Sequence, residues 1–72
     1  MKVVRIRVYD DENYIIEYIY MTNNIDKAMA KFKVDYPEYE GFEVNPDLFD
    51  LNNKKNKQHF KIAQECDVVR EV

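Results

Sequence analysis

The sequence predicts an α+β fold: a small single-layer β-sheet in the order ββαβαβ, with an N-terminal antiparallel hairpin and two amphipathic helices packed on it. Three observations predict it. Two N-terminal segments are rich in β-branched and aromatic residues, two later segments space apolar residues as helices do, and the chain ends on a short β-branched run. A chain of 72 residues with 46% hydrophobic content suffices for one core, so residues 1–72 are expected to form a single domain.

The first strand covers residues 3–9, where the apolar residues alternate. The period of two places Val4, Ile6 and Val8 on one face of the sheet and Val3, Arg5, Arg7 and Tyr9 on the other. Residues 14–21 form the second strand, and residues 10–13 suit a tight turn whose last residue, Asn13, takes the left-handed conformation.

The register of this hairpin also follows from the sequence. A loop of residues 11–13 predicts four cross-strand pairs: Asp10 with Tyr14, Arg7 with Glu17, Val8 with Ile16, and Ile6 with Tyr18. Opposite charges then face each other, and so do apolar residues. The competing register pairs Tyr9 with Tyr14 and places Glu17 opposite Ile6 on the core face, so it is disfavoured.

The first helix follows the capping residues 22–24 and ends before Pro37, because a residue that precedes proline is pushed out of the helical conformation. Five apolar residues at helical spacing define its buried stripe: Ile25, Ala28, Met29, Phe32 and Tyr36.

The segment from Asp35 to Asp50 combines six acidic residues with four aromatic ones and has no Lys or Arg. Residues 41–44 are expected to form a short third strand. Residues 45–51 are compatible with a strand, a turn or a single helical turn, and Pro46 argues against an uninterrupted central strand.

The second helix is expected from residue 54 onward, with Asn52 and Asn53 as capping candidates. On a helical projection one arc collects five residues: His59, Phe60, Ile62, Ala63 and Cys66. Residues 68–72 then form the last strand.

Enzymatic activity is not expected. His59 and Cys66 lie seven positions apart on one helix, about 10 Å along its axis, so they cannot share a metal ion or a hydrogen bond. The chain has no serine, one glycine and one threonine, which removes the usual phosphate loops and nucleophile elbows. We therefore expect no cofactor and no metal, and a buried, unreactive Cys66.

Composition also bears on partners and origin. A net charge of −3 and a pI near 5.0 are unusual for a nucleic-acid-binding protein. No apolar run is long enough to span a membrane, and the alternating start is unlike a signal peptide, so a cytoplasmic protein is expected. Residues with A/T-rich codons number 34 of 72, which favours a low-G+C bacterium or a phage, and an accessory protein of a phage or mobile element.

The sequence predicts a non-enzymatic protein–protein interaction module, which binds another protein or self-associates as a homodimer. The second face of the hairpin carries an apolar strip that two helices on the first face would leave uncovered: Val3, Ile15, Ile19 and Met21. Arg5 and Arg7 flank this strip, and the acidic segment adds Tyr39 and Glu40 to the candidate interface. The alternative is that residues 45–51 fold over the strip with Leu48, Phe49 and Leu51.

The runner-up function is nucleic-acid binding through Arg5, Arg7 and the basic cluster from Lys54 to Lys61. Stacking of bases on Tyr14, Tyr18 and Tyr20 would require these rings on an open sheet face, whereas the predicted register places them beneath the helices.

Overall fold

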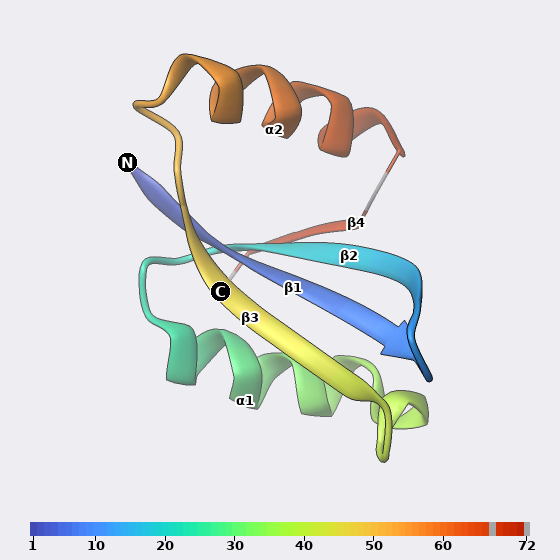
Figure 1. Cartoon of the computed structure of the whole chain (residues 1–72). Helices are drawn as coiled ribbons and strands as arrows, with labels where there is room; N and C mark the ends of the chain where they lie inside the picture. Colours follow the sequence, from blue (N-terminus) through green and yellow to red (C-terminus); the bar gives the residue numbers. More distant parts are fainter. Residues whose placement is uncertain (67, 72) are drawn as a thin grey trace.

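The computed structural model describes the backbone of residues 1–66 and 68–71 and the side chains of residues 1–62. The chain forms one four-stranded sheet in the order β3-β1-β2-β4, in which β3, β1 and β2 are antiparallel and β4 is parallel to β2 (Figure 1). The elements are β1 (Lys2–Asp10), β2 (Asn13–Met21), α1 (Ile25–Asp35), the 3-10 helix η1 (Pro37–Tyr39), β3 (Glu43–Asp50), α2 (Lys54–Cys66) and β4 (Val68–Glu71). The predicted α+β fold and the order ββαβαβ are confirmed.

The two helices lie on opposite faces of the sheet, as Figure 1 shows. On one face, even-numbered residues of β1 pack with Tyr18 and Tyr20 of β2 against Ala28 and Phe32 of α1. On the other face, Val3, Ile19 and Phe49 form a second cluster, against which Phe60 of α2 packs. The sheet is therefore the middle of three layers.

This arrangement corrects the expectation of an uncovered apolar strip. Val3 and Ile19 are completely buried, Met21 is half-buried, and Ile15 alone of the four is exposed, at 45%. The prediction was wrong because helical periodicity identifies the apolar stripe of a helix and leaves open which face of the sheet the stripe will cover.

Residues 45–51 do not fold over the strip either. Most of this segment is the body of β3, which pairs with β1 inside the same sheet. Phe49 and Leu51 do reach the second cluster, whereas Leu48 points to the other face and is 43% exposed. The edge strand thus contributes to the second core and α2 covers it.

The hairpin has the predicted register along most of its length. Arg7 pairs with Glu17, Val8 with Ile16 and Ile6 with Tyr18. Nearer the turn a β-bulge shifts the pairing, so that Tyr9 meets Tyr14 and Asp10 meets Asn13.

The bulge explains how pairs from both registers coexist. One extra residue, Ile15, is accommodated on β2 and leaves the charged and apolar pairs beyond it unchanged. The predicted pair of Asp10 with Tyr14 is wrong, and the residue with positive φ is Asp11 at 56°, not Asn13. The rings of Tyr9 and Tyr14 make an edge contact, with centroids 5.8 Å apart, which stabilises the shifted pair.

β3 is an edge strand, and this position accommodates Pro46. The N–H of Leu51 donates to the C=O of Met1, and the β1–β3 pairing continues from there without a shift. Because hydrogen-bonded pairs alternate along an antiparallel ladder, the odd-numbered residues of β3 direct their backbone N–H and C=O groups toward β1. The nitrogen of Pro46, an even-numbered residue, faces away from β1 and breaks no hydrogen bond of the sheet.

The helices begin where the sequence predicts. The Asn24 side chain accepts a hydrogen bond from the N–H of Lys27, and the Asn53 side chain accepts one from the N–H of Lys55. α1 ends at Asp35, two residues before Pro37. The expectation of a buried Cys66 falls outside the described side chains.

Burial of Ile19 gives a direct test of the layer arrangement. We expect Ile19→Lys to lower the free energy of unfolding by about 3 kcal/mol or more, because it places an unpaired ammonium between the sheet and α2. Urea denaturation followed by circular dichroism measures this loss. The control Val34→Lys, at a position 76% exposed on α1, should change stability by no more than about 0.5 kcal/mol. An Ile19→Lys protein as stable as the control would contradict the burial of this face.

Candidate functional site

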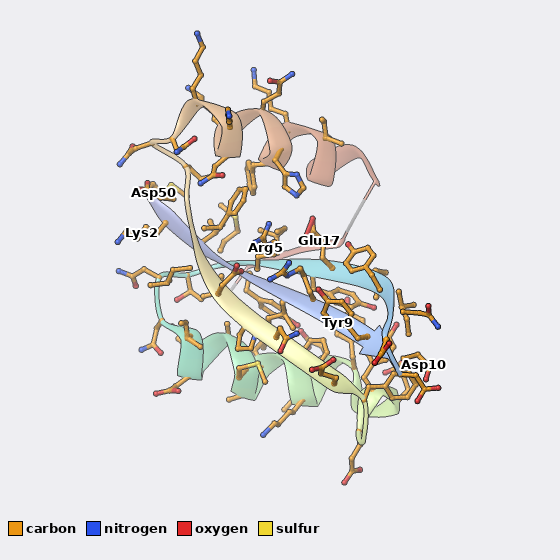
Figure 2. The ribbon with its side chains drawn as sticks, in the orientation of Figure 1. Lys2, Arg5, Tyr9, Asp10, Glu17 and Asp50 are labelled. Carbon is orange, nitrogen blue, oxygen red and sulfur yellow. The ribbon has the colours of Figure 1, made fainter. Side chains whose placement is uncertain are left out.

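Charged side chains meet on the face of the sheet that α2 covers. Arg5 binds Asp47 through two hydrogen bonds, from Nε to Oδ1 at 3.1 Å and from Nη2 to Oδ2 at 2.7 Å. Its Nε also lies 3.9 Å from Oε2 of Glu17, and Figure 2 shows Arg5 and Glu17 on the side of the sheet that faces α2. Arg5, Arg7, Glu17, Asp47 and His59 together form what we call the charged network.

Glu17 connects this network to α2. Its carboxylate is buried, and Oε1 lies 2.8 Å from Nε2 of His59. Phe49 packs against both basic neighbours of Glu17. The centre of its ring lies 5.4 Å from the centre of the His59 ring and 5.0 Å from the guanidinium carbon of Arg5. A buried carboxylate between two basic side chains holds α2 on the sheet. A histidine–carboxylate pair can also activate a serine nucleophile, but the sequence has no serine.

Arg5 and Arg7 are therefore engaged within the protein. The hydrogen bonds with Asp47 raise the pKa of the Arg5 guanidinium, and Nη2 of Arg7 lies 3.9 Å from Oδ2 of the same carboxylate. Two guanidinium groups face two carboxylates here, so their charges cancel. Of the two arginines predicted as interface or nucleic-acid contacts, Arg5 is held by hydrogen bonds within the protein, whereas the Arg7 side chain stays 37% exposed and its Nε has no hydrogen-bond partner among the described residues.

A second candidate site lies on the other face of the sheet, where α1 ends. A groove of about 560 Å³ runs between α1, η1 and the start of β3. We call it the aromatic groove, and it is lined by Met29, Phe32, Lys33, Tyr36, Pro37, Tyr39, Glu40, Gly41, Phe42 and Val44. The predicted interface residues Tyr39 and Glu40 both belong to it.

The wall of the groove is held in place by the core beneath it. The hydroxyl groups of Tyr18 and Tyr39 are hydrogen-bonded at 3.0 Å, and the Tyr39 ring lies parallel to Phe32 with centroids 6.1 Å apart. Phe42 makes an edge contact with Tyr39 at 5.5 Å and remains 37% exposed. The groove therefore offers a preformed aromatic surface to solvent.

The turn that carries Phe42 depends on Gly41. This glycine has φ of 91°, a conformation that side chains with a Cβ rarely adopt, and no atom lies close enough to obstruct a Cβ there. The backbone reversal places Phe42 beside Tyr39, and the N–H of Phe42 donates to the C=O of Tyr39 at 3.0 Å.

Exposed acidic residues surround this end of the sheet. The pairing of Tyr9 with Glu43 brings the hairpin turn beside the segment between α1 and β3. We call the resulting set the acidic end, and its members are Asp10, Asp11, Glu12, Glu38, Glu40 and Glu43.

Exposed lysines gather at the opposite end. Lys2 lies opposite Asp50 in the register of β1 and β3, at the last residue of β3. Figure 2 shows both residues far from Tyr9 and Asp10. The first turns of α2 follow directly. We call this set the lysine-rich end, and its members are Lys2, Lys54, Lys55, Lys57 and Lys61.

Within the described residues there is no group of three or more metal-binding side chains and no helix long and apolar enough to cross a membrane. Comparison with protein-family models, curated proteins and solved structures finds no match for this chain. The functional argument therefore rests on the two sites themselves.

The contact between Glu17 and His59 can be measured by a double-mutant cycle. We expect Glu17→Gln to destabilise the protein by about 1–3 kcal/mol, because Arg5 loses a nearby negative charge and His59 loses a charged hydrogen-bond partner. His59→Ala should cost about 1 kcal/mol, and the two changes should be non-additive by about 1 kcal/mol in urea denaturation. Gln58→Ala, at an exposed neighbouring position, is the control. Additive effects of the two changes would contradict a direct interaction.

The raised pKa of Tyr18 predicts that the protein loses stability at alkaline pH. Burial and the hydrogen bond with Tyr39 raise the pKa of the Tyr18 hydroxyl above its ordinary value of 10.0, so the folded protein holds this proton more tightly than the unfolded chain. The resulting stabilisation is complete below pH 10 and is lost as the pH rises above it. Urea midpoints measured across this range should fall more steeply for the wild type than for Tyr18→Phe. The control Tyr9→Phe retains the Tyr18–Tyr39 pair and should keep the wild-type slope.

Proposed function

We propose that this chain is a non-enzymatic protein-recognition module that binds a polypeptide in the aromatic groove. The single observation that carries the proposal is the groove itself, an aromatic surface built on a rigid core and left open to solvent at Phe42. Grooves of this kind concentrate binding energy in a few aromatic side chains. Of the candidate interface residues, Tyr39 and Glu40 line this groove, and the apolar strip lies outside it.

The chemistry of the groove favours a partner with both apolar and basic side chains. The rings of Tyr36, Tyr39 and Phe42 suit aliphatic groups, and their faces attract cations. Two charged residues line the groove, Glu40 and Lys33, and Glu38 and Glu43 lie close to Glu40 in the chain, so negative charge is in excess there. A lysine or arginine side chain matches this combination, since its stem is apolar and its head is positive.

Two further expectations from composition belong to this proposal. The chain has one cysteine and therefore no internal disulfide, in keeping with a cytoplasmic protein. Its A/T-rich codon vocabulary supports an origin in a low-G+C bacterium or its phage, in the role of an accessory protein.

Nucleic-acid binding is the alternative function. The exposed lysines of α2 favour it, whereas Arg5 and Arg7 are paired with carboxylates and the acidic end would repel phosphates. The two hydrogen bonds that hold Arg5 on Asp47 weaken this alternative.

Titration with short synthetic peptides tests the proposed function. We expect a peptide that alternates lysine and leucine to shift the amide NMR signals of Glu40, Gly41 and Phe42, and a glutamate–leucine peptide to shift none of them. Phe42→Ser should weaken binding by about tenfold or more, because it removes the exposed ring, and Val34→Ser is the matched control at an exposed site outside the groove.

Two outcomes would overturn this function. One is equal binding of the basic and acidic peptides, and the other is an unchanged affinity of Phe42→Ser. Light scattering with and without a DNA duplex distinguishes the alternative, since complex formation only with DNA would favour nucleic-acid binding.

A further inference from the structure

We propose that the occupant of the aromatic groove is a second copy of this chain, which docks its lysine-rich end against the groove and the acidic end around it. The inference rests on the proposed function and names its partner. It predicts head-to-tail association, in which each molecule uses one end as a receptor and the other as a ligand.

The first argument is charge complementarity between the two ends. The acidic end has six exposed carboxylates, and within its two segments, residues 10–12 and 38–43, the sequence has no lysine or arginine. The lysine-rich end has five exposed ammonium groups. Asp50 lies at that end as well, but it is half-buried and its carboxylate accepts a hydrogen bond from the N–H of Asn52.

The second argument is the distance between the ends. Glu43 begins β3 and Asp50 finishes it, so the two ends are about 23 Å apart at the rise of an extended strand. Side chains cannot span this distance within one molecule. The complementary charges can therefore meet only between molecules, and contacts between like ends, which a two-fold dimer at either end requires, are repulsive.

The third argument is the shape and polarity of the lysine-rich end. Met1 is 65% exposed there, and it lines a shallow apolar depression together with Leu51 and Phe60. Lys57 and Lys61 lie at the margin of this depression. An apolar centre with a basic margin is the counterpart of an aromatic groove beside which Glu38, Glu40 and Glu43 outnumber the one lysine of its lining, Lys33.

The free edge of β3 is a poor competitor for self-association. Pro46 removes one outward-facing N–H from that edge, and the strand carries acidic residues at Glu43, Asp47 and Asp50. Two copies pairing through this edge would bring carboxylates together. Association through the ends avoids both obstacles.

The size of the molecule limits the strength of this contact. The two shorter dimensions of the molecule are 24 and 18 Å, so an end face offers about 430 Å² and a contact buries about 860 Å² in total. Specific stable interfaces bury about 1,200–2,000 Å². We therefore expect weak, concentration-dependent and salt-dependent association.

Sedimentation equilibrium of charge-swapped variants tests the inference. One variant reverses the acidic end with Glu40→Lys and Glu43→Lys, and the other reverses the lysine-rich end with Lys54→Glu and Lys57→Glu. All four positions are exposed, and new carboxylates in the first turn of α2 favour its helix dipole, so both variants should fold. Lys27→Glu with Val34→Glu, at two exposed positions of α1 outside both ends, is the control for added negative charge.

For the wild type we expect an average mass above 8.7 kDa as the concentration approaches about 1 mM at about 0.05 M salt, and a return to 8.7 kDa at about 0.5 M salt. Each charge-swapped variant alone should remain at the monomer mass. An equimolar mixture of the two should associate again, because each supplies the intact end that the other lacks. The α1 control should behave as the wild type.

Three outcomes would overturn the inference: a monomeric wild type at every concentration, a mixture that fails to associate, or a dimer that both charge swaps leave intact. The peptide titration separates this failure from failure of the proposed function. Peptide binding without self-association leaves the groove as a receptor for a different protein, whereas self-association without peptide binding removes the groove from the contact.

Discussion

The fold depends on one constraint, the burial of both faces of β1. Val3 and Val4 are adjacent in sequence, point to opposite faces, and are both inaccessible to solvent. A strand with apolar side chains on each face can be stable in water only as an inner strand with a cover on either side. β2 and β3 therefore flank β1 in the sheet, and α1 and α2 cover its two faces. So short a chain meets this demand with three layers, and most of the apolar strip of the hairpin lies in the second core.

Much of this architecture can be predicted from patterns within a few residues of the sequence. Two features differ from the prediction: the β-bulge depends on the pairing between strands, and the placement of α2 depends on contacts between segments far apart in the sequence. The pair of Arg7 with Glu17 fixes the register from charge and alternation alone, and Asn24 and Pro37 bound α1 through local backbone preferences. The bulge at Ile15 adds a residue without disturbing the pairs beyond it, so neither charge nor alternation reveals it. α2 covers the face of the sheet that α1 leaves uncovered, the face with Val3, Ile19 and Phe49. Which face this is depends on contacts between distant segments, and no local sequence pattern contains that information.

The same division applies to the candidate sites. Tyr39 and Glu40 were predicted from the mixture of aromatic and acidic residues around them, and they line the groove. The hydrogen bond between Tyr18 and Tyr39 joins residues 21 positions apart, and the contact between Glu17 and His59 joins residues 42 positions apart. No local pattern indicates either contact. The predicted register pairs Glu17 with Arg7 and says nothing of a cover over Glu17. Its burial follows from the position of α2, and Arg5 supplies a positive charge 3.9 Å away while His59 supplies a hydrogen bond at 2.8 Å.

The edge position of Pro46 has a consequence for the fate of the unfolded and partly folded chain. Residues 14–21 are β-branched or aromatic almost throughout, which is typical of segments that form cross-β fibrils. A fibril grows by adding strands to an exposed edge, and each added strand needs an unbroken ladder of hydrogen bonds. In the native sheet β2 lies between β1 and β4, and the edge formed by β3 presents a ladder interrupted at Pro46. One proline thus lets a chain rich in aggregation-prone strands keep an open sheet edge without templating its own polymerisation through the backbone.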